Sequence, residues 1–153
     1  MTANRHETED ERLDRKFQDL LQELRVMQTG AQLTAGFLLT LPFQEPFQDL
    51  NDFQRTIYLT LVVVAGLTTA LLLSPVAIHR RLSGAHVKER VVTAAHRLAA
   101  AALTTLALLI VGIIFFTFDV VVDRTTAFVA AGAMAVAVGS LLLALPFRLS
   151  GKS

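Results

Sequence analysis

Four long apolar segments constrain this chain more than any other feature of its sequence. The chain has 153 residues, of which 53% are hydrophobic, and no Asp, Glu or Lys lies within these segments. At a rise of about 1.5 Å per residue, a helix of about 20 residues matches the hydrocarbon thickness of a bilayer. We therefore predict an all-α integral membrane protein, a four-helix bundle whose spans cover about residues 25–43, 56–78, 95–118 and 125–147. Pro42, Pro75 and Pro146 lie near the ends of three of them, where proline disfavours helix continuation.

The distribution of Lys and Arg predicts how the spans are oriented. Twelve of the fourteen basic residues lie in the N-terminal region, in the loop 79–97 or after the fourth span, and only Arg55 and Arg124 lie on the other side. Because basic residues are retained on the cytoplasmic side, both chain ends and the middle loop are predicted to be cytoplasmic. The polar first 24 residues do not resemble a cleavable signal peptide, so we expect the mature protein to keep its N-terminus.

The predicted N-terminal unit, residues 1–24, is an acidic amphipathic helix that continues into the spans of residues 25–149, and residues 150–153 form a cytoplasmic tail. Its apolar residues recur at helical spacing at positions 13, 17, 20, 21 and 24. Four basic and seven acidic residues give it a net charge of −3. This sign is unfavourable for anionic lipid, so a protein surface is the expected partner of the helix.

Polar side chains in the first span form the main candidate site. Arg25, Gln28, Gln32 and Gly36 follow one another at steps of three, four and four, so they share one helix face. We expect this face to look into the bundle. It either lines a path for water, an ion or a lipid head group, or it holds helices together through hydrogen bonds. The second interpretation is favoured because no carboxylate accompanies the glutamines.

Asp119 and Asp123 are the acidic residues closest to a span. They stand one helical turn apart, after the third apolar segment, and are predicted to lie at the outer surface rather than at the middle of the membrane. Each could pair with Arg55 or Arg124. Because coupling to protons or sodium normally needs an ionisable group deep in the membrane, this position argues against coupled transport.

Two histidine-arginine pairs mark the predicted inner ends of the second and third spans. These are candidate contacts for lipid head groups or for sensing pH: His79, Arg80, His96 and Arg97. A metal site is disfavoured, because their spacing matches no usual ligand pattern.

The fourth span is rich in small residues. Ala131, Ala135 and Gly139 lie four apart, and Ala127 extends the row by one turn. Small residues at this spacing let helices approach closely, so they form a candidate packing face within the bundle or between copies. In the outer loop, Phe47, Leu50 and Phe53 are spaced three apart, which fits either a short helix on the outer leaflet or a loop with apolar anchors.

Several kinds of chemistry find no support in the sequence. There is no cysteine, so disulfides, thiolate ligands and cysteine nucleophiles are excluded. Motifs for phosphate binding, nucleophilic catalysis and zinc hydrolysis are absent, and the basic residues flank spans rather than forming a nucleic-acid surface. We predict a non-enzyme that needs no cofactor and does not bind nucleic acid.

Four sequence blocks resemble a family of small bacterial four-span membrane proteins known as a domain of unknown function. They are ELRVMQTGAQLTAGFLLTLPF (23–43), FQRTIYL (53–59), SPVAIHRRL (74–82) and AHRLA (95–99). The likeness covers roughly residues 20–124 and is most specific in the first and third blocks. It implies a four-span fold in a bacterial cell membrane. Some members of the family carry a sodium:proton antiporter label, which agrees poorly with the lack of a carboxylate in the middle of any span.

Two hypotheses of function follow. The first is a non-catalytic accessory or structural membrane protein that contacts lipid or a partner protein, either as further copies of itself or within a larger membrane complex. The alternative is a small oligomeric transporter or channel whose pathway uses Arg25, Gln28 and Gln32.

Overall fold

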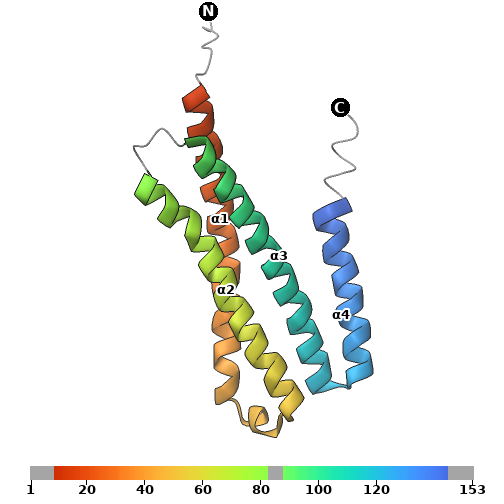
Figure 1. The fold of residues 1–153 in the computed structure, drawn as a ribbon. Helices are drawn as coiled ribbons and strands as arrows, with labels where there is room; N and C mark the ends of the chain where they lie inside the picture. The colour runs from red at the N-terminus through yellow and green to blue at the C-terminus, as the bar shows by residue number, and fades with distance from the viewer. Residues whose placement is uncertain (1–8, 83–87, 145–153) are drawn as a thin grey trace, which may run out of the picture.

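The computed structural model describes residues 9–82 and 88–144, and these residues form an all-α fold without strands, as predicted. Its four long helices are α1 (Glu9–Thr40), α2 (Asp52–Leu82), α3 (Lys88–Val121) and α4 (Arg124–Gly139) (Figure 1). Two short 3₁₀ helices, η1 (Leu41–Phe43) and η2 (Glu45–Asp49), connect α1 to α2. A π-helical turn, η3 (Ser140–Ala144), follows α4.

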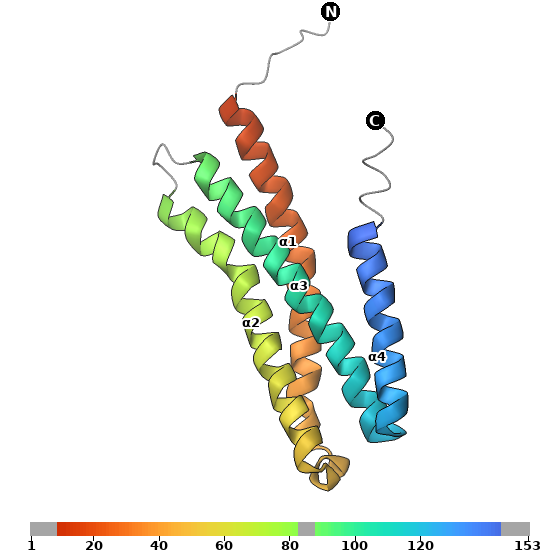
Figure 2. The same cartoon turned by 45° about the vertical axis from the view of Figure 1, so that its right-hand side comes forward.

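The helices run alternately up and down, so the start of α1 and the end of α4 lie at the same end of the molecule (Figure 1). In Figures 1 and 2, α1, α2 and α3 lie side by side, and α4 stands beside α3. Each pair among α1, α2 and α3 is packed together, whereas α4 packs along α3, and its first residue, Arg124, also reaches Phe53 of α2 within the described parts of the chain. The fold is therefore a three-helix core with α4 attached to one of its helices.

The buried positions of the three core helices repeat every seven residues. On α2 they alternate by three and four: Tyr58, Leu61, Ala65, Thr68, Leu72 and Pro75. On α3 they are Ala95, Ala102, Leu109 and Phe116, and on α1 they are Phe17, Leu20, Leu24, Ala31 and Leu38. This spacing is the one that lets neighbouring helices interlock side chains over a long distance, as in coiled coils. It explains why three helices of more than 30 residues stay in contact along their length.

α1 contains both the predicted amphipathic segment and the first predicted span. The predicted amphipathic segment is confirmed, because Phe17, Leu20 and Leu24 form its buried stripe, together with Leu72 and Ala95. No break separates this segment from the apolar residues that follow, since α1 is helical from Glu9 to Thr40. The polar first part of α1 is thus held by the same core as the rest of the helix.

Pro75 does not end α2, although its position suggested a helix end. The helix continues for seven residues to Leu82. The ring of Pro75 is buried in the core, and the preceding Ser74 hydroxyl donates to the Ala70 carbonyl at 2.8 Å. Proline is tolerated inside membrane helices where neighbouring groups and packing compensate for the lost backbone hydrogen bond.

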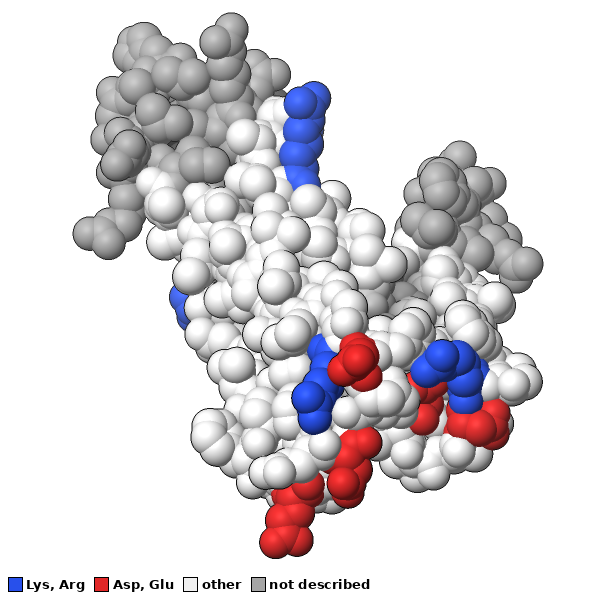
Figure 3. Space-filling model, turned by 60° about the horizontal axis from the view of Figure 1, so that its bottom comes forward, with Lys and Arg blue, Asp and Glu red and all other residues white. Residues whose placement is uncertain are grey.

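Three helices are long and apolar enough to cross a membrane: the segments Asp52–Ala77, Thr93–Val121 and Arg124–Leu142. Their surfaces are largely apolar side chains left exposed by the chain itself, such as Val63, Leu108 and Val136. In Figure 3, charged side chains gather at the end that comes forward, and the helix walls behind it are mostly uncharged. This distribution is consistent with a membrane location. α1 is not among the three, so the span predicted at residues 25–43 stays a prediction.

The connection between α1 and α2 does not form the single short helix that the spacing of its apolar residues allowed. It folds into η1 and η2, and its apolar side chains are divided, since Leu50 turns inward whereas Phe43 is 87% exposed. Leu50 is buried, and Phe47 packs against Tyr58 with ring centroids 4.9 Å apart. Phe53 is the second residue of α2. Phe47, Leu50 and Phe53 therefore do not share one lipid-facing side.

Candidate functional site

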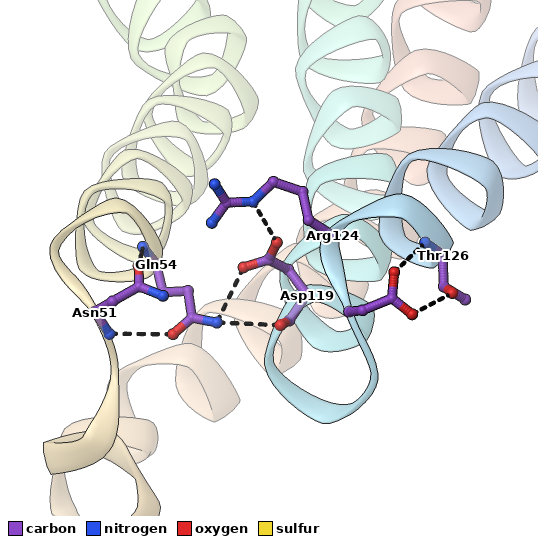
Figure 4. A network of polar contacts seen from close by, with 6 residues as sticks. Asn51, Gln54, Asp119, Arg124 and Thr126 are labelled. Atoms are coloured by element: carbon purple, nitrogen blue, oxygen red, sulfur yellow. Dashed lines mark hydrogen bonds and ion pairs between the residues drawn. The ribbon is translucent and has the colours of Figure 1, made fainter.

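The start of α2 is fixed by a reciprocal pair of hydrogen bonds. The Asn51 backbone N–H donates to Gln54 Oε1 at 3.1 Å, and the Gln54 backbone N–H donates to Asn51 Oδ1 at 3.0 Å (Figure 4). This arrangement is a capping box, which satisfies donors that the first turn of a helix leaves unpaired. It uses the oxygen of the Gln54 amide and leaves its NH₂ group free to bind elsewhere.

The Gln54 NH₂ group binds the last turn of α3. It donates to Asp119 Oδ2 at 3.0 Å and to the Asp119 carbonyl at 3.1 Å. Arg124 Nε donates to the other carboxylate oxygen, Asp119 Oδ1, at 2.9 Å (Figure 4). Asp119 is only 8% exposed. Both oxygens of this buried carboxylate are therefore engaged, and through it Gln54 links the beginning of α2 to the end of α3 and the beginning of α4.

Aromatic rings cover this polar network. The Arg124 guanidinium carbon lies 3.8 Å from the centroid of the Phe53 ring, a cation–π contact. Phe53 and Phe115 meet edge-on at 6.4 Å, and Phe115 meets Phe128 of α4 at 4.9 Å. The rings bring α2, α3 and α4 together at the same level as the ion pair, so aromatic and polar contacts both hold this end of the three helices together.

The predicted pairing of Asp119 with Arg124 is confirmed, whereas the predicted surface position of Asp119 is wrong. Asp119 is buried and takes Arg124 as its partner. Asp123 is the N-cap of α4: it accepts from the Thr126 backbone N–H at 3.0 Å and from the Thr126 hydroxyl at 2.7 Å. These hydrogen bonds hold the pKa of the Asp123 carboxyl below its usual value, and the bond from the Thr126 backbone N–H has the largest effect. Arg55 instead donates to the Gln48 carbonyl at 3.0 Å.

Tyr58 is a buried core residue of α2. Its hydroxyl donates to the Leu38 carbonyl at 3.0 Å, and its ring contacts Phe116 at 6.1 Å. Leu38 lies in the last turn of α1, where carbonyls have no partner within the helix. Beside this contact, an apolar cavity of 290 Å³ is lined by Leu41, Gln44, Pro46, Phe47, Leu50, Phe116 and Val120.

The polar face of the first predicted span does not look into the bundle, and this prediction is wrong. Arg25, Gln32 and Gly36 are exposed, and Gln28 is half-buried. Neither glutamine side chain forms a hydrogen bond within residues 9–82 and 88–144. The core of α1 is made by the stripe that contains Leu24, Ala31 and Leu38 on another side of the helix. The apolar stripe, and not the polar one, determines which way α1 faces.

Packing places this exposed polar face at the depth of a membrane-spanning segment. A cavity of 160 Å³ between α1 and α2 is lined by Ala35, Leu38, Leu39, Val62, Ala65 and Gly66. Its α2 residues lie at the middle of the candidate span Asp52–Ala77. Gln32 is about 8 Å from that level along α1, and Arg25 is about 18 Å from it. A hydrocarbon layer of about 30 Å centred on that level would include Gln32 and would end near Arg25.

The histidine-arginine pairs are only partly described. The side chains of His79 and Arg80 lie outside the described residues, whereas His96 and Arg97 are exposed on α3. No group of three or more His, Asp or Glu side chains that could hold a metal ion occurs in the described segments.

The small-residue face of α4 is divided between two environments. Ala127 and Ala131 are buried against α3. Gly139 is half-buried and Ala135 is exposed, further toward the end of α4 that stands away from α1 (Figure 1). The predicted face, Ala131, Ala135 and Gly139, is thus used for packing only at its first residue.

Sequence reasoning missed the residues that tie the outer end together. Gln54 could have been found, because an Asn followed three residues later by Gln, directly before an apolar segment, is typical of a capping box. Its bond to Asp119 had no such local signal, since the two residues lie 65 positions apart.

Of three comparisons with known proteins, one gives a match, and this match covers nearly the whole chain. No curated protein and no solved structure matches it. A family model matches residues 6–146, from the beginning of α1 to beyond η3, and its description is "Family of unknown function (DUF6328)". The chain, with its four helices and its three segments apolar enough to span a membrane, therefore belongs to the DUF6328 family of unknown function.

Proposed function

We propose that this chain is a non-catalytic membrane protein, an accessory or structural element that presents the exposed polar face of α1 to another membrane-embedded protein segment. The proposed location is the bacterial inner membrane, with both chain ends in the cytoplasm. The bias of Lys and Arg toward one side supports this orientation. The four-span arrangement is supported by α1, which packs alongside two candidate spans.

One observation carries the proposal. Gln32 is exposed at the surface of α1, about 8 Å from the level of the span centre, and its amide has no hydrogen-bond partner among the described residues. An amide facing hydrocarbon alone leaves two donors and an acceptor unsatisfied, which costs several kcal/mol by order of magnitude. A polar contact from another protein segment removes this cost. A water-filled path would remove it as well.

Because a water-filled path would also satisfy the Gln32 amide, a transport function is the alternative. The same face, Arg25, Gln28 and Gln32, lies on the outside of the chain, so it could line a pathway only between copies or against another protein. The ion pair of Asp119 and Arg124 lies near the other end of the helices, away from this face. Gln54 binds the second oxygen of the Asp119 carboxylate, so this group is already fully hydrogen-bonded. A transporter would then have to work without a carboxylate at the level of Gln32.

A photo-crosslinking amino acid placed at position 32 in native membranes tests the proposal. The same residue at position 63 is the matched control, because Val63 is 69% exposed on α2 near the middle of its span. We expect position 32 to yield protein adducts of discrete mass and position 63 to yield lipid adducts. Lipid adducts alone at position 32 would contradict the proposal.

Flux measurements separate the two functions. In vesicles containing the purified protein, replacing Gln28 and Gln32 by leucine should abolish ion or proton flux if the face lines a pathway. If the protein is non-catalytic and non-transporting, the unmodified chain shows no flux above that of empty vesicles.

A further inference from the structure

We propose that the partner of the α1 polar face is the same face of a second copy, so that two α1 helices pair in parallel around a two-fold axis through Gln32 and Gly36. This inference rests on the function proposed above and names its partner. The pairing surface is the α1 stripe, defined as Gln22, Arg25, Thr29, Gln32 and Gly36, all of which are exposed.

The spacing of the α1 stripe is the first argument. Its members follow one another at steps of three, four, three and four residues. This is the same period as the buried stripes that hold α1, α2 and α3 together. Residues at this spacing form a continuous seam that stays in register with an equally spaced seam on a neighbouring helix. α1 therefore carries two seams, one toward its own core and one on roughly the opposite side.

Membrane insertion restricts how two such seams can meet. All copies of a chain share one orientation in the bilayer, so two α1 helices from neighbouring copies can pair only in parallel. A two-fold axis between them brings each residue opposite its own counterpart. Gln32 then faces Gln32 of the second copy at the same depth. Because an amide both donates and accepts hydrogen bonds, it is complementary to itself, whereas a single charge is not.

The shape of the surface agrees with close approach. A Cβ atom built on Gly36 would meet nothing within 4 Å, so this position presents bare backbone to a neighbour. Ala35 and Leu39, next to Gly36, line the 160 Å³ cavity between α1 and α2. Gly66 on the α2 side of this cavity also has open space around its Cα. Small residues at the level of the span centre let two backbones come close, as in other membrane helix pairs.

Charge does not oppose the pairing within the hydrocarbon layer. The part of the α1 stripe at this depth, Thr29 to Gly36, contains no ionisable group, and the Thr29 hydroxyl is already bonded to the Arg25 carbonyl at 3.1 Å. Arg25 lies about 18 Å from the span centre, where a long side chain reaches the lipid phosphates. The charges of two arginines at this level are therefore compensated by lipid phosphates, which weakens the repulsion between them.

Because the chain has no cysteine, disulfide formation between single cysteines reports the interface directly. The test variants are Gln32→Cys and Gly36→Cys, oxidised in native membranes. Controls are Phe37→Cys and Val63→Cys, since Phe37 and Val63 are 65% and 69% exposed near the same depth. Phe37 is about 100° around the helix from Gly36. A disulfide needs Cα atoms within about 7 Å, so only residues in the seam should react.

We expect covalent dimers at positions 32 and 36 and several-fold less at positions 37 and 63. Adding Gln32→Leu to the Gly36→Cys variant should weaken association by about threefold to tenfold, the effect of losing one interhelical hydrogen bond. Gln32→Asn, which keeps an amide, should retain most of the crosslinking. The unfolding temperature of each variant in detergent shows that the chain itself still folds.

Four outcomes would overturn the inference. Equal crosslinking at all four positions would indicate random collisions, and stronger crosslinking at position 37 or 63 would place the interface elsewhere. If position 32 gives no dimer but the photo-crosslinking residue there gives adducts with a different protein, the second copy is excluded while the proposed function stands. If neither experiment gives a protein adduct, both fall.

Discussion

At the scale of single residues, the outer end of the molecule depends on which group of Gln54 faces Asp119. The Gln54 NH₂ donates to a carboxylate oxygen of Asp119, while its Oε1 takes part in the capping box. Gln54→Glu keeps the capping box, because glutamate serves as well at this position. It replaces the donor by a second carboxylate. We expect a loss of about 2 kcal/mol in the free energy of unfolding, the usual size of a hydrogen bond to a charged group.

Exchanging the two groups should reverse this loss. In the double variant Gln54→Glu with Asp119→Asn, the amide and the carboxylate change places and the donor-acceptor pair is restored. Urea or thermal unfolding in detergent measures the stability of Gln54→Glu, of Asp119→Asn and of the double variant. The double variant should be more stable than Gln54→Glu alone. Additive losses would show that the two side chains do not interact.

The N-cap of α4 makes a prediction about pH. Since hydrogen bonds from Thr126 lower the pKa of Asp123 in the folded chain, its ionised form favours folding. This stabilisation is complete above the ordinary Asp pKa of about 3.9 and is lost as the pH falls through the lower, folded-state pKa. At neutral pH, Asp123→Ala should lower Tm by about 3 °C, as expected for a lost cap.

The difference in Tm between the native chain and Asp123→Ala should therefore shrink as the pH falls below the ordinary Asp pKa and through the lower pKa of folded Asp123. Asp123→Asn is the control, because asparagine caps helices without ionising. It should keep most of the native Tm at neutral pH. A Tm difference for Asp123→Ala that stays constant down to low pH would show that the charge of the cap contributes nothing.

At the scale of the helices, the contact between α2 and α3 depends on Gly112. A Cβ atom built on Gly112 would collide with the Leu61 side chain, which is buried between the two helices. In a helix interior, alanine is otherwise preferred over glycine by about 1 kcal/mol. We expect Gly112→Ala to cancel this gain and to destabilise the fold by about 1 kcal/mol, the cost of overpacking.

Gly132 provides the matched comparison. It lies in α4 with nothing within 4 Å of an added Cβ, so Gly132→Ala should stabilise the chain by about 0.5–1 kcal/mol. Trimming the neighbour as well, in Gly112→Ala with Leu61→Ala, should cost less than the sum of the two single changes. Equal stabilisation by both glycine substitutions would mean that α2 and α3 are not closely packed at this level.

The sequence predicted the helices better than their faces. Apolar, uncharged segments reveal where helices form, because a membrane or a core must cover them. A helical period shows only which residues share a face. It placed Arg25, Gln28 and Gln32 together, yet it could not show that Leu24, Ala31 and Leu38 would take the core side of α1. That choice depends on α2 and α3, whose buried stripes are distant in sequence.

Contacts between residues distant in the sequence are the second feature that the sequence could not predict. Asp119 looked like a surface residue because it ends an apolar segment, but Gln54 and Arg124 together bury it. The position of α4 is another example. Its small residues indicated close packing, and the structure provides a neighbour only for Ala127 and Ala131. The length over which such a face is buried depends on how far the neighbouring helix runs alongside it.

At the scale of the whole molecule, the number of spans determines on which side of the membrane each chain end lies. Among the described residues, three helices, α2, α3 and α4, are long and apolar enough to be recognised as candidate spans. With three spans and α1 outside the bilayer, the start of α1 and the end of α4 would lie on opposite sides of the membrane. Because α1 packs antiparallel against α2 along the same depth, we predict four spans and therefore both ends on one side.

Labelling of single cysteines in intact cells decides between these arrangements. A membrane-impermeant maleimide should label Gln48→Cys, in the exposed outer turn η2, but neither Thr2→Cys nor Ser153→Cys until the cells are opened. Labelling of Thr2→Cys without opening the cells would mean that α1 stays outside the bilayer. Gln32 would then face water, its amide would need no partner, and the pairing of two α1 helices would lose its physical basis. The topology of α1 is thus the premise on which the function proposed for its polar face depends.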